Sequence, residues 1–147
     1  MAPTTYADVL ARNIRATRAR RGISQESVAT RMRNLGHDGW VRQTVGSTEK
    51  PTRRVTADEI LGLSLALDTT VSALMAPADE DKMIDFPAGG SLPVMAVRLS
   101  AVGKTIDGAV QWDGDKPVFP PADYPPGAVD VMSRMAAGTW PPSGGER

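Results

Sequence analysis

The sequence predicts a mainly α-helical fold, in which five short helices fill residues 1–76 and a small α+β segment follows. Apolar residues recur every three or four positions in the first half, which is the spacing of an amphipathic helix. Residues that favour helix ends separate these runs. After residue 77 the pattern changes to runs rich in Val, Ile and Leu, separated by glycine and Asp-Gly turns. Together these features predict two or three short strands and a short helix in the second half.

The first helix is predicted to begin near Thr5 and to end at Gly22. Thr5 and Asp8 fit a Thr-x-x-Asp capping pattern, and the carboxylate also suits the positive end of a helix. Leu10 and Ile14 recur at helical spacing and should face the core. Gly22 can adopt a positive φ without steric cost, so it is a good helix terminator.

Two short helices and a long turn should follow. Ser24 is a good N-cap for a second helix through residues 25–32. The next stretch, residues 33–41, is rich in Asn, Gly and Asp and predicts a turn. A third helix is expected at about residues 40–50, with Val45 and Thr48 on its inner side.

The last two helices of the first half are predicted from their start signals. Thr56 and Glu59 form a complete capping box before the apolar stripe of Ile60, Leu63 and Leu67. Residues 70–75 predict one more short helix, and a proline follows it. We therefore expect one helical domain over residues 1–76.

The second half predicts a different organisation. Residues 77–91 are acidic and carry a Gly-Gly pair at 89–90, which is typical of a linker. Strands are expected near residues 92–100, 104–112 and 116–119, and a short amphipathic helix near residue 126. Residues 92–147 should then form a small β-rich segment with a flexible C-terminal tail, serving dimerisation or the binding of a partner or effector.

The zero net charge hides a strong asymmetry between the two halves. Up to Arg54 there are eleven Arg or Lys residues and four Asp or Glu residues, a balance of +7. The remaining six basic and thirteen acidic residues give a balance of −7. Such asymmetry is typical of a protein with one polyanion-binding face, although a merely solvated basic face would look the same.

The composition argues against several other classes of protein. Cysteine is absent and there is a single histidine, so neither a metal cluster nor a nucleophile–base pair is apparent. No apolar run approaches the roughly 20 residues that span a bilayer. We therefore expect a cytoplasmic protein that is not an enzyme, uses no cofactor or metal, and does not bind membranes.

Three stretches of the first half carry a family resemblance. They are ISQESVATRM at 23–32, RQTVGSTEKP at 42–51 and TADEILGLSLALDTTVSALMAP at 56–77. In order and spacing they resemble the helix-turn-helix family of the lambda and 434 repressors and Cro, the XRE family of bacterial and phage transcriptional regulators. The resemblance covers about residues 6–76 and implies a five-helix, repressor-like domain whose third helix enters the major groove of DNA.

The resemblance also implies roles for individual residues. Those expected to reach base edges are Arg42, Gln43, Thr44 and Ser47. Those expected to contact phosphates are Gln25, Lys50, Arg53 and Arg54. Arg18 and Glu49 occupy the positions of a structural ion pair between the first and third helices. Trp40 is expected to fill the core and His37 to lie on the surface.

These features predict a sequence-specific regulator that binds double-stranded DNA, with repression as the commoner mode of the family. A homodimer on an inverted-repeat operator is expected, and residues 77–147 could bind a protein or small-molecule partner. The alternative is an antitoxin-like or adaptor module that keeps the helical fold without reading DNA. The turn at 33–41 is longer than the family's usual turn, so the third helix could be tilted or begin one residue early.

Overall fold

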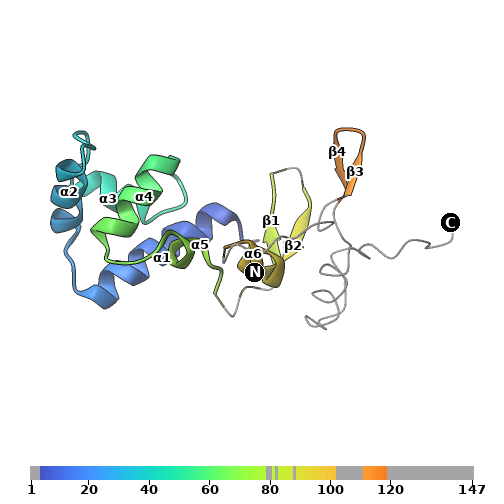
Figure 1. The fold of residues 1–147 in the computed structure, drawn as a ribbon, viewed down its shortest axis with the longest axis horizontal. Helices are drawn as coiled ribbons and strands as arrows, with labels where there is room; N and C mark the ends of the chain where they lie inside the picture. Colours follow the sequence, from blue (N-terminus) through green and yellow to red (C-terminus); the bar gives the residue numbers. More distant parts are fainter. Residues whose placement is uncertain (1–3, 79–80, 82, 88, 102–110, 119–147) are drawn as a thin grey trace. The chain divides into compact units, whose positions relative to one another are not determined.

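A computed structural model of the chain describes residues 4–78, 81, 83–87, 89–101 and 111–118 (Figure 1). The helices are α1 (Tyr6–Arg21), α2 (Gln25–Asn34), α3 (Arg42–Thr48), α4 (Ala57–Ala66), α5 (Val71–Met75) and α6 (Val94–Ala101). The strands are β1 (Met83–Asp85), β2 (Ser91–Pro93), β3 (Gln111–Asp113) and β4 (Lys116–Val118). The prediction of five helices followed by a small α+β segment is therefore confirmed.

The chain divides into two compact units. One is the helical unit Tyr6–Ala76, which holds α1 to α5. The other joins the residues before α1 to those from Pro77 onward. One apolar core fills the helical unit, with side chains contributed by α1 to α5 and by Trp40, and its largest fully buried members are Ile14, Met32, Leu63 and Leu67.

The helix boundaries follow from local chemistry. The hydroxyl of Ser24 accepts a hydrogen bond from the backbone N–H of Ser27, so it caps α2 as predicted. Thr56 and Glu59 form the predicted capping box at the start of α4. Gly22 has a φ of +65° at the turn after α1, a conformation that glycine adopts readily. These caps satisfy backbone groups that a helix end leaves without partners.

Side chains of α1 hold the short helix α5. The hydroxyl of Tyr6 donates to the carbonyl oxygen of Met75 at 2.9 Å. The side-chain amide of Asn13 donates to the carbonyl oxygens of Leu74 and Ala76. The first and last helices of the unit therefore lie side by side, as Figure 1 shows.

The second unit contains a small sheet with one covering helix. Strands β1 and β2 pair antiparallel, with Ile84 opposite Leu92. Residues 4 and 5 extend this sheet, because the N–H of Asp85 donates to the carbonyl oxygen of Thr4 and Thr5 forms a parallel bridge with Asp85. Apolar side chains of the sheet and α6 are buried here, namely Ile84, Leu92, Val94 and Val97.

The strand predicted at residues 92–100 is wrong for most of its length. Strand β2 ends at Pro93, and residues 94–101 form α6 instead. Proline has no N–H to give to a strand ladder but suits the start of a helix. Val94 and Val97 are buried three residues apart, which is the spacing of one helix face. In addition, β1 lies within the segment 77–91 that the sequence predicts to be a linker.

The remaining predicted elements lie at the end of the described chain. Strands β3 and β4 form a hairpin in which Trp112 faces Pro117 across the pair. Strand β4 matches the strand predicted near 116–119, whereas β3 overlaps only the end of the one predicted at 104–112. Residues 104–110 and the helix predicted near residue 126 lie outside the described residues. Among the helices that the structure describes, none is long and apolar enough to cross a membrane.

Candidate nucleic-acid interface

Helix α3 packs one face into the core and presents the other to solvent. Val45 and Thr48 are buried, whereas Arg42, Gln43 and Ser47 are exposed. The exposed residues therefore include three of the four predicted to reach base edges. The hydroxyl of Ser47 donates to the carbonyl oxygen of Gln43 at 2.9 Å, which leaves its oxygen able to accept from a ligand.

The fourth predicted reader, Thr44, is only half-buried and has a local role. Its hydroxyl oxygen accepts a hydrogen bond from the backbone N–H of Val41 at 3.2 Å, across the start of α3. Helix α3 is expected to begin near residue 40, and it begins at Arg42. The long turn therefore does not shift its start to an earlier residue. The turn is fastened to α2, because Arg33 donates to the carbonyl oxygen of Trp40 at 2.6 Å.

Glu49 connects the first three helices. Arg18 and Glu49 form the ion pair that the family resemblance implies, with a second contact of 3.2 Å between Nη2 and Oε2. The side-chain amide nitrogen of Gln25 donates to Oε2 of the same carboxylate at 3.0 Å. The hydrogen bond with Glu49 raises the pKa of Arg18 above its ordinary value. The carboxylate side chain is only 6% exposed, so this contact fixes the end of α3 against α1 and α2.

A shallow open depression lies beside this cluster. Side chains from α1, from the start of α2 and from the first residue of α3 line it, namely Arg18, Ser24, Gln25, Glu26 and Arg42. One of the two N–H groups of the Gln25 amide goes to Glu49, so the other remains able to donate. The depression thus places Arg42 and an amide donor next to the N-terminus of α2, where backbone N–H groups attract anions.

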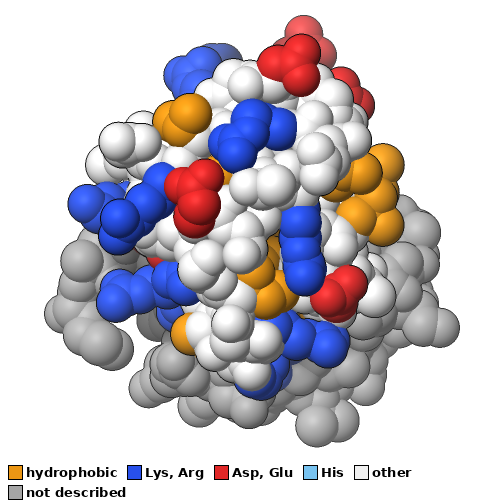
Figure 2. All heavy atoms as spheres, turned by 90° about the vertical axis from the view of Figure 1, so that its left-hand side faces the viewer, with side chains coloured by type: hydrophobic (Ala, Val, Ile, Leu, Met, Phe, Trp, Pro, Cys, Tyr) orange, Lys and Arg blue, Asp and Glu red, His pale blue; other side chains and the backbone are white. Residues whose placement is uncertain are grey.

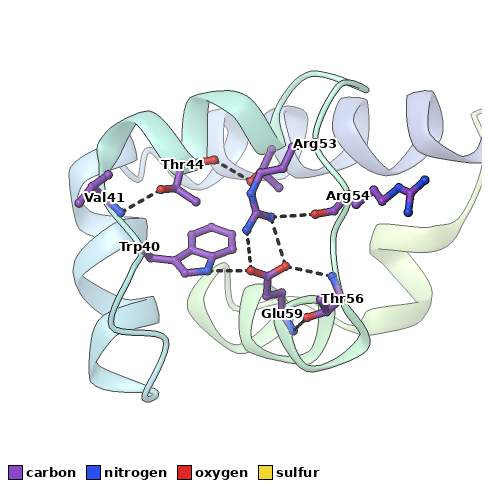
Figure 3. Close-up of polar contacts among 8 residues, drawn as sticks. Trp40, Val41, Thr44, Arg53, Arg54, Thr56 and Glu59 are labelled. Atoms are coloured by element: carbon purple, nitrogen blue, oxygen red, sulfur yellow. Dashed lines mark hydrogen bonds and ion pairs between the residues drawn. The ribbon is translucent and has the colours of Figure 1, made fainter.

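The loop after α3 holds its three positive side chains differently. Lys50 and Arg54 are exposed, as a contact with phosphate requires. Arg53 is instead engaged within the protein: its guanidinium pairs with both carboxylate oxygens of Glu59, at 2.6 and 3.1 Å. Figure 3 shows Arg53 turned toward Glu59 and Trp40, whereas the side chain of Arg54 points away from them.

Glu59 is the functional residue whose full role sequence reasoning missed. The capping box identified its bond to Thr56, but not its bonds to Trp40 and Arg53. The hydrogen bond from Arg53 is the largest of several contacts that lower the pKa of Glu59 to about 2. Those partners lie in loops 19 and 6 residues away, and no local pattern connects them.

Trp40 is buried as expected, being 3% exposed, but His37 is not a simple surface residue. The His37 ring is half-buried, stands edge-on to Trp40 and lies close to Gly62 of α4. A glycine at position 62 leaves the room that the imidazole fills. The long turn is thus packed against α4 through two aromatic rings.

The side of the molecule that carries α2 and α3 is predominantly positive. Figure 2 views the protein from this side and shows Lys and Arg side chains spread over the surface, with separate carboxylates between them. Within the described residues, no three His, Asp or Glu side chains come together as a metal site would require. The Lys and Arg side chains of this face can form hydrogen bonds and ion pairs with an anionic ligand.

Comparisons with known proteins find similarity to solved structures. No family profile matches the chain, and no curated protein matches it. Among solved structures, the chain is similar to the restriction-modification controller protein C.AhdI from Aeromonas hydrophila, with 31% identity over 46% of this chain and 94% of that one, and a TM-score of 0.40. It is also similar to the hypothetical transcription factor NHTF from Neisseria, with 28% identity over 50% of this chain and 78% of that one, and a TM-score of 0.43.

The family assignment rests on the sequence identity together with the features of the helical unit. The identity of 31% extends over nearly the whole controller protein. The helical unit has five helices in the expected order, a turn between α2 and α3, and the Arg18–Glu49 ion pair. Through its helical unit, the chain belongs to the XRE-like helix-turn-helix family.

Proposed function

We propose that this protein is a sequence-specific transcriptional regulator that binds double-stranded DNA, acts as a repressor, and reads the major groove with α3, its recognition helix. The observation that carries the proposal is the exposure of Arg42 and Gln43 at the start of α3, on a helix whose opposite face is anchored in the core. An exposed helix of this kind fits the major groove, where each base pair presents a distinct pattern of donors and acceptors.

The side chains on the outer face of α3 suit direct readout of bases. Arg42 can donate two hydrogen bonds to guanine, and Gln43 can pair with adenine through its amide. Each such pair discriminates against a wrong base by about 1–3 kcal/mol. Ser47 adds a hydroxyl oxygen that can accept a hydrogen bond, since its O–H donates to Gln43. The methyl group of Thr44 can contact thymine, although its oxygen caps the helix.

Contacts with the DNA backbone would come from the start of α2 and from the loop after α3. The second N–H of the Gln25 amide, at the start of α2, can donate to a phosphate. Lys50 and Arg54 are exposed in the loop. These contacts position the protein on the duplex and make binding weaker as salt rises.

We further propose that the helical unit is the DNA-binding domain and that two copies bind an inverted repeat. A homodimer would place two recognition helices about 34 Å apart, one turn of the DNA helix. Residues 77–147 would serve the dimer, or would bind a protein or small-molecule partner. The two similar solved structures are a restriction-modification controller protein and a hypothetical transcription factor, in keeping with this proposal.

The test is selection of binding sites from a random duplex library with the full-length protein. An Arg42→Ala/Gln43→Ala variant provides the comparison, and Arg20→Ala, which removes an exposed arginine from α1, provides a control for lost charge. We expect the wild-type protein and the control to enrich an inverted-repeat motif that the double variant does not enrich. If no variant and no wild-type sample enriches a motif, an adaptor or antitoxin-like role replaces the proposed one.

A further inference from the structure

We propose that Glu59 is a positioning residue for the recognition helix, and that Arg53 acts through Glu59 and Trp40 instead of binding a DNA phosphate. This inference rests on the proposed function, because it concerns how α3 and the loop after it are held for DNA. It departs from the family resemblance, which would assign Arg53 to the phosphate contacts.

The carboxylate of Glu59 accepts four hydrogen bonds. Its Oε1 accepts from Nε1 of Trp40 at 3.1 Å and from Nη2 of Arg53 at 2.6 Å. Its Oε2 accepts from Nη1 of Arg53 at 3.1 Å and from the backbone N–H of Thr56 at 2.9 Å. A carboxylate offers about four acceptor positions, so this one is fully occupied within the protein.

The donors come from the two segments that flank the recognition helix. Trp40 lies two residues before the first residue of α3, and Arg53 lies five residues after the last. Both are fastened to one side chain of α4 (Figure 3). A single carboxylate thus fixes the turn that leads into α3 and the loop that leaves it, and so limits the orientations that α3 can take.

Arg53 has little capacity left for DNA. Its guanidinium lies 5.1 Å from the centre of the Trp40 ring, close enough for a cation–π interaction. The same group pairs with both oxygens of Glu59, and the two side chains are only 27% and 12% exposed. Moving Arg53 to a phosphate would leave a carboxylate without its counter-charge beside DNA, which is unfavourable.

The arrangement also fixes the neighbouring residue. Nη1 of Arg53 donates to the carbonyl oxygen of Arg54 at 3.2 Å. The backbone at Arg54 is thereby held while its side chain extends away from the cluster (Figure 3). In this arrangement Arg54 makes the phosphate contact and Arg53 places it.

Two substitutions distinguish a positioning role of Arg53 from a phosphate contact by the direction in which they change DNA affinity. Glu59→Gln keeps the shape of the side chain but removes the charge that holds Arg53, and its single oxygen can accept from Trp40 or from Thr56 but not from both. If Arg53 were a phosphate contact, Glu59→Gln would free it and tighten DNA binding. Arg53→Lys keeps the charge but loses the two N–H groups that pair with Glu59 and the planar group that lies over the Trp40 ring. A lysine would preserve a phosphate contact, since lysine also binds phosphate as a point charge.

We would measure affinity for the selected operator over a range of salt concentrations. We expect Glu59→Gln and Arg53→Lys each to weaken binding about tenfold, with an unchanged dependence on salt. The matched variant Arg54→Gln should instead reduce the slope of log K against log salt by about 0.9, as for one lost phosphate contact. Tighter binding by Glu59→Gln, or wild-type binding by Arg53→Lys, would overturn the inference.

A measurement without DNA separates this inference from the proposed function. The indole N–H signal of Trp40 in a ¹H–¹⁵N spectrum, assigned with Trp40→Phe, reports the bond to Glu59. It should move in Glu59→Gln and Arg53→Lys and stay in place in Arg54→Lys, while the spectra show that each variant is folded. A wild-type protein that selects no DNA sequence would overturn the proposed function even if these signals move. A wild-type protein that selects DNA, with no change in the indole signal, would overturn only the inference.

Discussion

The side-chain amide nitrogen of Asn13, in the middle of α1, lies 2.9 Å from the carbonyl oxygen of Leu74 in α5. The same nitrogen lies 2.7 Å from the carbonyl oxygen of Ala76, so both of its N–H groups are used. Helix α5 has only five residues and could not persist in isolation. Asn13 therefore supplies donors that the last turn of the helical unit cannot provide for itself.

Replacing Asn13 with alanine should lower the free energy of unfolding by about 2 kcal/mol, because two part-buried carbonyl groups lose their donors. Urea denaturation followed by circular dichroism measures the effect. Asn34→Ala is the control, since Asn34 is exposed at the end of α2. Equal stability of the two variants would show that water replaces Asn13 without cost.

Replacing Arg18 with methionine should lower the free energy of unfolding by about 3–5 kcal/mol, because the nearly buried carboxylate of Glu49 loses its counter-charge. The double variant Arg18→Met/Glu49→Gln should recover part of that loss, since no uncompensated charge remains. Glu26→Gln serves as the control, because the ion pair of Glu26 with Arg33 is solvent-exposed and should contribute less than about 1 kcal/mol. A double variant no more stable than Arg18→Met would contradict this explanation.

Two helical glycines should respond oppositely to alanine. At Gly62 a Cβ would lie 2.9 Å from Nε2 of His37 and 3.0 Å from the terminal methyl of Met32, so Gly62→Ala should destabilise the protein by about 1–3 kcal/mol. At Gly46 the nearest atom would be 3.7 Å away, so Gly46→Ala should stabilise it by about 0.5–1 kcal/mol. Thermal unfolding compares them, and adding His37→Ala to Gly62→Ala should restore part of the loss. A Gly62→Ala protein as stable as the wild type would mean that the ring moves aside freely.

The pH dependence of stability should reveal the carboxylate of Glu59. Its pKa is lowered to about 2 in the folded protein, chiefly by Arg53, from an ordinary value of 4.5. The unfolded chain therefore binds the proton first as the pH falls, and the contribution of Glu59 is lost between about pH 4.5 and 2. Above that window the contribution is complete and constant.

Urea midpoints of the wild type and Glu59→Gln, measured from pH 7 down to pH 2, test this expectation. The difference between the two proteins should be constant above pH 5 and should shrink toward pH 2. A difference that already declines between pH 7 and 5 would show that Glu59 has a higher pKa and is not held by Arg53 as described.

The local features of the helical unit were predictable from sequence, whereas the contacts between distant loops were not. The caps at Ser24 and at Thr56 with Glu59 depend on residues three apart, and the structure has both. The hydrogen bonds of Glu59 with Arg53 and Trp40 depend on how two loops pack against α4, which no spacing along the chain encodes. For the same reason Arg53 and Arg54, identical in type and adjacent in sequence, could not be told apart.

In the second half the apolar pattern was ambiguous. The stretch from Leu92 to Val97 carries apolar residues compatible with either a strand or a helix face, and short runs of this kind are not separated by periodicity. Pro93 decides the outcome, because it ends β2 and can begin a helix. Strand β1 was missed because Ile84 is the only member of its three residues that is buried, too short a signal to distinguish from a linker.

The pairing of residues 4 and 5 with β1 means that a strand-like contact closes a loop of about eighty residues, with the whole helical unit inside it. The folded helical unit lowers the entropy cost of closing this loop, because the hydrogen bond between Tyr6 and Met75 holds the two ends of the loop close together. The helices should therefore form before the sheet, and hydrogen exchange during refolding should find amides of α1 protected earlier than those of β1. The pairing of residues 4 and 5 with β1 would then form only after the helical unit has folded. A chain trimmed of its first five residues would keep the helices and lose only this pairing.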